Sequence, residues 1–200
     1  MSKITAILLA AGFSSRMKGE NKMLLPFREN SILQSTYNQL KKSKVAEVII
    51  VGGDAFQRLV NELRIDSQDS IVQNDTPALG MTSSIQTGLK LIKENAFMIC
   101  LGDMPTLSTY HYNMLIDCYQ EAIDKDQRAI AVPSVNGQQA NPVIFSQSYR
   151  EEILSNVVPN GCKSVIALNK SHLVYLNTDD SQFLNDIDTL EDYDQLLNEP

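Results

Sequence analysis

Short apolar runs alternate along the chain with longer segments in which apolar residues recur every three or four positions. Runs of the first kind are typical of buried strands, and segments of the second kind are typical of amphipathic helices. Their alternation predicts repeated βα units and therefore an α/β fold, a Rossmann-like three-layer sandwich with a mostly parallel sheet. Strands are expected at residues 4–9, 47–51, 70–73, 97–101, 129–132, 142–145 and 172–176.

Helices are expected between these strands, at residues 32–42, 56–63, 83–94, 110–124, 149–154, 163–169 and 190–198. No Pro/Gly/Ser-rich linker, internal repeat or low-complexity tract interrupts the alternation. We therefore expect one domain over residues 1–200. In open parallel sheets, ligands bind beyond the carboxyl ends of the strands, so the loops that follow strands are the candidates for chemistry.

The composition of the 200-residue chain is that of an ordinary globular protein, with 43% hydrophobic and 20% charged residues. Its apolar runs are far shorter than the ~20 residues that span a bilayer. The first residues lack the features of a signal peptide, so a cytoplasmic location without a membrane partner is expected. Cys100, Cys118 and Cys162 are widely spaced, which predicts neither a disulfide framework nor a zinc site.

The net charge of −7 argues against nucleic acid as a partner, because a surface that binds nucleic acid needs clustered Lys and Arg. A nucleotide partner would therefore be small. Acidic proteins still bind phosphates through a few well-placed basic residues. Local groups of Lys and Arg therefore indicate a phosphate site better than the total charge does.

The loop after the first expected strand, residues 9–17 (LAAGFSSRM), combines small residues with a cation and is followed by Lys22. Small residues let the backbone turn sharply and bring its N–H groups against phosphate oxygens, while Arg16 and Lys22 add positive charge. The loop matches neither G-x-G-x-x-G nor G-x-x-x-x-G-K-[ST], which excludes the two commonest nucleotide fingerprints. It could equally be an ordinary turn into a helix, capped by Ser14.

Carboxylates occur in two further loops. Asp103 closes a strongly apolar strand and could hold Mg²⁺, which prefers oxygen ligands, or could cap the turn before Pro105. Asp186 and Asp188 come late in the chain, and an extended backbone would point both to one face, opposite Asp103. The alternative is a solvated acidic turn, which is common in a chain this acidic.

Residues 80–85 (GMTSSI) open a helix. The hydroxyls of Ser83 and Ser84 and the free N–H groups of a helix start suit the edge of a base or an anion. Plain helix capping accounts for the same residues, and for this segment taken alone it is the favoured interpretation.

Five motifs stand in a fixed order over nearly the whole chain: residues 9–17, 21–26 (NKMLLP), 102–105 (GDMP), 141–145 (NPVIF) and 186–193 (DIDTLEDY). Each motif is weak alone, but the combination resembles the molybdenum cofactor cytidylyltransferases of the MobA-like nucleotidyltransferase superfamily. The resemblance implies a glycosyltransferase-A-like fold. The sequence departs from the family pattern in the length of the loop before Lys22, in Ala140, and in residues 159–164.

The resemblance implies a reaction in which the terminal phosphate of molybdopterin attacks the α-phosphate of CTP, giving molybdopterin cytosine dinucleotide and pyrophosphate. Arg16, Lys22 and Asp103 would be the catalytic residues, and Asp103 and Asp188 would bind Mg²⁺, with Asp186 as the less favoured second ligand. The residues expected to contact the nucleotide are Leu9, Ala10, Ala11, Gly12, Phe13, Ser14, Ser15, Arg16, Lys22, Gly80, Ser83, Ser84 and Asp103.

Guanylyltransferase relatives usually show Leu-Ala-Gly-Gly where this chain has Leu-Ala-Ala-Gly, so Ala11 indicates CTP as the substrate. A methyl group in a close-fitting pocket is worth ~1–3 kcal/mol, enough to bias the choice of base. The candidate partner that receives the product is a molybdenum hydroxylase or its maturation factor. Two other functions stay open: nucleotidyl transfer to another phosphorylated small molecule, such as a sugar or alditol phosphate, and a non-catalytic nucleotide-binding module that delivers cofactor.

Overall fold

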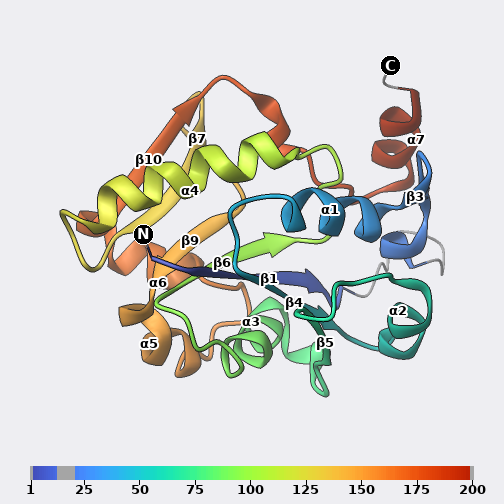
Figure 1. Ribbon diagram of the computed structural model, residues 1–200, viewed down its shortest axis with the longest axis horizontal. Helices are drawn as coiled ribbons and strands as arrows, with labels where there is room; N and C mark the ends of the chain where they lie inside the picture. Colours follow the sequence, from blue (N-terminus) through green and yellow to red (C-terminus); the bar gives the residue numbers. More distant parts are fainter. Residues whose placement is uncertain (1, 13–20, 199–200) are drawn as a thin grey trace.

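The computed structural model describes residues 2–12 and 21–198, and they form a three-layer α/β sandwich around an eight-stranded sheet (Figure 1). Its strand order is β10-β7-β9-β6-β1-β4-β5, with the short β8 paired to β7. The strands are β1 (Ile4–Ala10), β4 (Glu47–Gly52), β5 (Ser70–Gln73), β6 (Ala96–Leu101), β7 (Ile130–Val135), β8 (Gln138–Gln139), β9 (Val143–Ser146) and β10 (Leu173–Thr178). A separate hairpin pairs β2 (Pro26–Phe27) with β3 (Asn30–Ser31).

The α-helices are α1 (Ile32–Lys41), α2 (Phe56–Glu62), α3 (Met81–Leu89), α4 (Thr109–Ile123), α5 (Arg150–Leu154), α6 (Lys163–Leu168) and α7 (Leu190–Asn198). α1 and α4 cover one face of the sheet, and α3, α5 and α6 lie on the other (Figure 1). The predicted α/β sandwich is therefore confirmed. Most strands pair in parallel, but β9 runs antiparallel to both β6 and β7.

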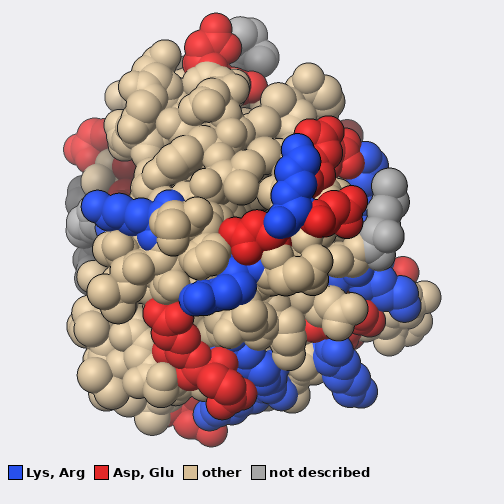
Figure 2. Space-filling model, turned by 90° about the vertical axis from the view of Figure 1, so that its left-hand side faces the viewer, with Lys and Arg blue, Asp and Glu red and all other residues tan. Residues whose placement is uncertain are grey.

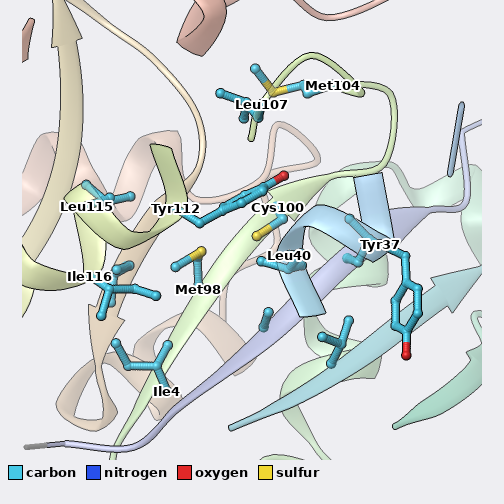
Figure 3. Packing of buried hydrophobic residues seen from close by; sticks show 14 of the residues in the cluster. Ile4, Tyr37, Leu40, Met98, Cys100, Met104, Leu107, Tyr112, Leu115 and Ile116 are labelled. Carbon is cyan, nitrogen blue, oxygen red and sulfur yellow. The ribbon is translucent and has the colours of Figure 1, made fainter. Parts of the chain in front are cut away.

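The centre of the sheet is buried on both faces, which explains why its strands appear in the sequence as continuous apolar runs. Every residue of β1 is buried. Successive side chains point to opposite faces, so Ala6 and Leu8 pack toward α1 and α4, while Ile7 and Leu9 pack toward α3. Figure 3 shows the first of these two cores, where Tyr112 of α4 lies beside Cys100 of β6.

Helix α3 differs from its predicted range, because it begins at Met81 and ends at Leu89. The guanidinium of Arg150 donates hydrogen bonds to the carbonyl oxygens of Leu89 and Ile92, at 2.5 and 3.2 Å. These bonds satisfy carbonyl groups that a longer helix would have paired internally. A residue far along the chain therefore caps the carboxyl end of α3.

Helix α7 begins as its sequence predicts. The Asp192 carboxylate accepts hydrogen bonds from the backbone N–H groups of Asp188 and Thr189, and the Thr189 hydroxyl accepts one from the N–H of Asp192. This reciprocal pairing at a helix start fixes the backbone just before α7. It also holds in place the loop that carries Asp186 and Asp188.

Among the described residues, no helix is both long and apolar enough to cross a membrane. On the face seen from the left of Figure 1, acidic and basic side chains lie next to one another between areas of uncharged residues (Figure 2). That the whole of residues 1–200 forms a single domain stays a prediction.

Candidate active site

A cavity of about 440 Å³ lies beyond the carboxyl ends of β1 and β6, where the parallel sheet predicts a ligand site. Segments that are far apart in the sequence line it together. Its walls are formed by Leu9, Ala11, Gly12, Lys22, Met23, Pro77, Gly80, Met81, Ser84, Leu101, Asp103, Asp186 and Asp188.

The close approach of β1 and β6 sets the position of Asp103. Gly102 donates its backbone N–H to the carbonyl oxygen of Leu9 at 2.9 Å. A Cβ atom at Gly102 would lie 2.7 Å from that oxygen and 2.8 Å from Leu33 Cδ1, so only glycine fits there without a shift. Asp103 therefore begins its loop directly against the loop that follows β1.

Lys22 lies at the centre of the polar side of this cavity. It begins the short 3-10 helix η1 (Lys22–Leu24), whose start is capped by the Asn21 side chain. The Lys22 Nζ atom lies 2.5 Å from Asp103 Oδ2 and 3.2 Å from Asp188 Oδ1, and donates a hydrogen bond to the carbonyl oxygen of Ile187 at 2.8 Å. Burial lowers the pKa of Lys22, but the carboxylates of Asp103 and then Asp188 outweigh that effect and raise it. The ammonium group is therefore charged at neutral pH.

Asp103, Asp186 and Asp188 form an acidic cluster in which one oxygen from each lies within 4.8 Å of the others. Asp103 is buried, whereas Asp186 is exposed. Partial desolvation, and then the negative charges of Asp103 and Asp188, raise the pKa of Asp186. A backbone hydrogen bond of 3.1 Å from the Ile187 N–H to the Asp103 carbonyl oxygen joins the two segments that supply the cluster.

This cluster fits a divalent cation. Its ligands are carboxylate oxygens, which Mg²⁺ and similar hard cations prefer. Asp103 Oδ1 is buried and has no hydrogen-bond partner among the described residues, although a buried carboxylate oxygen normally has one. A cation bound to that oxygen would satisfy it.

The predicted phosphate-binding loop is only partly described. Leu9, Ala11 and Gly12 line the cavity, whereas Ala10 is buried in the core and touches a neighbouring hollow of about 90 Å³. Phe13, Ser14, Ser15 and Arg16 lie outside the described residues, so their contacts with a nucleotide stay predictions.

A sequence model of the family described as the MobA-like NTP transferase domain matches residues 6–174, which includes both Lys22 and Asp103. The chain belongs to this family. The matched region contains strands β4 to β9 and the loops that follow β1 and β6, whereas Asp186 and Asp188 lie beyond it.

Known proteins that are similar to this MobA-like NTP transferase are named for different activities. The chain is 24% identical to the molybdenum cofactor cytidylyltransferase of Escherichia coli K12, over 96% of this chain and 95% of the relative. It is 25% identical to the nicotine blue oxidoreductase of Paenarthrobacter nicotinovorans, over 97% of this chain and 96% of the relative. Family membership alone therefore does not define the substrate.

Solved structures share the fold. Rv0371c from Mycobacterium tuberculosis H37Rv superposes with a TM-score of 0.81 at 24% identity, covering 99% of this chain and 98% of the other. A second structure of that protein is a complex with manganese, with a TM-score of 0.76 at 23% identity and full coverage of both chains.

In this MobA-like NTP transferase, only some residues of the turn that opens α3 line the cavity. Gly80 and Ser84 line the cavity, and their contact with a nucleotide stays a prediction. Ser83 is not among the residues that line the cavity, and its hydroxyl donates to the carbonyl oxygens of Thr76 and Gly80, at 3.0 and 2.9 Å, so its contact with a nucleotide stays a prediction. A hydroxyl used in this way cannot donate to a ligand.

Two residues near the site were not singled out from the sequence: Asn74, which bonds to the side chains of that turn, and Met81, which lines the cavity. A polar residue directly after a strand was the available signal for Asn74. The histidines lie elsewhere: the ring of His111 contacts Asp180 and the start of α4, and the ring of His172 contacts Asp126.

Proposed function

We propose that this chain transfers CMP from CTP to the terminal phosphate of molybdopterin, giving molybdopterin cytosine dinucleotide and pyrophosphate. The observation that carries the proposal is the convergence of Lys22 with the acidic cluster of Asp103, Asp186 and Asp188 in one cavity. Such a pairing of cation and carboxylates suits a triphosphate and a divalent cation bound together. Similarity to the E. coli cytidylyltransferase along nearly the full length of both chains supports the choice of reaction.

In the proposed reaction, an oxygen of the acceptor phosphate forms a bond to the α-phosphorus of CTP. The bond between that phosphorus and the oxygen bridging to the β-phosphate breaks, and pyrophosphate leaves with the electron pair. The acceptor phosphate is already anionic, so no strong general base is needed. This accords with the positions of His111 and His172, neither of which lines the cavity.

Positive charge is what the site must supply, because negative charge builds on the α-phosphate and on the leaving group. Lys22 has its ammonium group held at the cavity wall and would act near the α-phosphate. Arg16 is proposed to bind the outer phosphates. A divalent cation, proposed to be Mg²⁺ held by Asp103 and Asp188, would supply the remaining charge when bound.

The preference for CTP is proposed from Ala11. This residue lines the cavity, and its methyl group is proposed to take up space that a glycine would leave to a larger base. The expected discrimination is ~1–3 kcal/mol, as for other single methyl groups in close-fitting pockets. The proposed recipient of the product is a molybdenum hydroxylase or its maturation factor.

Pyrophosphate release measures this proposal directly. Purified protein with Mg²⁺ and molybdopterin should release pyrophosphate from CTP at least about 10-fold faster than from GTP, the ratio that ~1.4 kcal/mol gives. Equal rates, or a preference for GTP, would remove the cytidylyl assignment.

The acceptor is tested in the same assay. Release that needs a sugar or alditol phosphate in place of molybdopterin would identify the alternative transferase. CTP binding without turnover on any of these acceptors would favour the non-catalytic delivery module.

A further inference from the structure

Asn74 is a buried polar residue at the end of β5, with only 2% of its surface exposed. Its Oδ1 atom accepts a hydrogen bond from the backbone N–H of Thr76 at 3.0 Å. Because a backbone N–H can only donate, this bond fixes which end of the amide is oxygen. The NH₂ group of Asn74 must therefore face the start of α3.

That NH₂ group donates to two serine hydroxyls, to Ser83 Oγ at 2.8 Å and to Ser84 Oγ at 2.9 Å. The hydrogen of the Ser83 hydroxyl is already used on backbone carbonyls. The hydrogen of the Ser84 hydroxyl has no acceptor among the described residues, and Ser84 lines the active-site cavity. The Ser84 oxygen therefore accepts a hydrogen bond from Asn74, while the hydroxyl hydrogen can still donate to a ligand in the cavity.

We infer that Asn74 is a positioning residue for base selection: it holds the Ser84 hydroxyl so that its hydrogen points into the cavity and donates to an acceptor on the pyrimidine ring. The inference rests on the proposed use of CTP. Cytosine offers ring nitrogen N3 as an acceptor, whereas the same nitrogen of uracil carries a hydrogen. A fixed donor therefore favours CTP over UTP, since a buried polar group left unpaired by the wrong ligand costs affinity.

The opposite side of the turn is held as well. The Thr82 hydroxyl donates to the carbonyl oxygen of Val158 and accepts from the Gly161 N–H. Gly80 adopts φ +86°, and a Cβ atom there would lie 2.6 Å from the carbonyl oxygen of Pro159. With its backbone fixed in this way, the turn has little freedom to compensate when the Asn74 bond is changed.

The test is Asn74→Asp, which keeps the shape of the side chain and the bond from the Thr76 N–H but replaces the donor by an acceptor. The hydrogen of the Ser84 hydroxyl would then turn toward the new carboxylate and away from the cavity. Isothermal titration with CTP and UTP in Mg²⁺ should show CTP binding weakened about 10-fold and the preference for CTP over UTP lost. The matched control is Asn61→Asp on exposed helix α2, which adds the same charge and should leave both affinities unchanged.

Two serine variants separate positioning from a general effect on the fold. Ser84→Ala should lose the preference for CTP over UTP, while Ser83→Ala should keep it. Combining Asn74→Asp with Ser84→Ala should weaken CTP binding no more than the weaker-binding single variant does, because Asn74 acts through Ser84. Multiplied losses in the double variant, or a preference kept in Ser84→Ala, would overturn the inference.

Different results would overturn the role of Asn74 and the proposed function. Wild-type protein that prefers CTP, with variants that keep this preference, would overturn the role of Asn74 and leave the proposed function standing. Wild-type protein that binds neither CTP nor UTP would overturn the proposed function itself, and the role of Asn74 with it.

Discussion

The ammonium of Lys22 bridges Asp103 and Asp188, at 2.5 Å from one and 3.2 Å from the other. A divalent cation bound to the remaining oxygen of Asp103 and to Asp188 would lie close to this ammonium, and the two positive charges would repel each other. We therefore expect such a cation to compete with Lys22 for the two carboxylates and to favour its movement toward a bound nucleotide.

The first prediction concerns this competition. In Lys22→Met, the acidic cluster loses its internal cation, so Mn²⁺ binding without nucleotide should tighten about 10-fold, or ~1.4 kcal/mol. Titration followed by the electron paramagnetic resonance signal of free Mn²⁺ measures it. Lys41→Met breaks the ion pair with Asp69 on another part of the protein and should leave Mn²⁺ affinity unchanged. Weaker Mn²⁺ binding in Lys22→Met would rule out the competition.

A second prediction is for Asp103→Asn, which keeps the size of the side chain but removes its charge. We expect kcat to fall about 10²–10³-fold, as when other groups that stabilise transition-state charge are removed. The variant should remain folded, because Asp188 and the Ile187 carbonyl oxygen still contact Lys22. Circular dichroism checks the fold, and Asp117→Asn, in an exposed ion pair with Lys44, serves as the control. Full activity in Asp103→Asn would show that the metal assignment is wrong.

Gly102→Ala gives a third prediction. The added methyl group would press on the Leu9 carbonyl oxygen and on Leu33 Cδ1, so we expect ~1–3 kcal/mol of destabilisation. Asp103 should shift with the strand end, which would lower kcat. The control is Gly12→Ala, whose added methyl group meets no described atom within 4 Å. Its urea unfolding midpoint should equal that of the wild type. Equal unfolding midpoints for wild type and Gly102→Ala would contradict the close packing of β1 on β6.

The fourth prediction is a pH dependence at the start of α4. The backbone N–H of Gln182 lowers the pKa of Asp180, and the His111 ring adds to this against an opposing effect of burial. A carboxylate with a lowered folded-state pKa stabilises the fold above its unfolded pKa of about 3.9, and this stabilisation is lost as the pH falls through the folded value. Asp180→Asn should therefore be less stable than wild type at pH 6, and the difference should shrink below about pH 4. Urea unfolding at several pH values measures it, and a difference that grows in acid would contradict the assignment.

Much of the fold could be predicted, because strands that are buried on both faces appear in the sequence as continuous apolar runs. The antiparallel direction of β9 could not, because its four residues are apolar whichever way the strand runs. The same limit applies to the end of α3, where Arg150, distant in sequence, donates a hydrogen bond to the carbonyl oxygen of Leu89.

The proximity of Asp103 to Asp188 could be expected, because the family resemblance implies that both carboxylates bind the same metal ion. The role of Ser83 could not be separated from that of Ser84 by sequence. Adjacent hydroxyls at a helix start look alike in the sequence, and only the structure shows that the Ser83 hydroxyl donates to the carbonyl oxygens of Thr76 and Gly80.

A crystal structure with CTP and Mn²⁺ tests the proposed site most directly, because anomalous scattering locates the metal. We expect a Mn²⁺ peak between Asp103 and Asp188, the triphosphate against residues 10–12, and Lys22 Nζ moved from Asp103 to a phosphate oxygen. A metal peak away from this cluster, or a triphosphate bound outside the cavity, would contradict it.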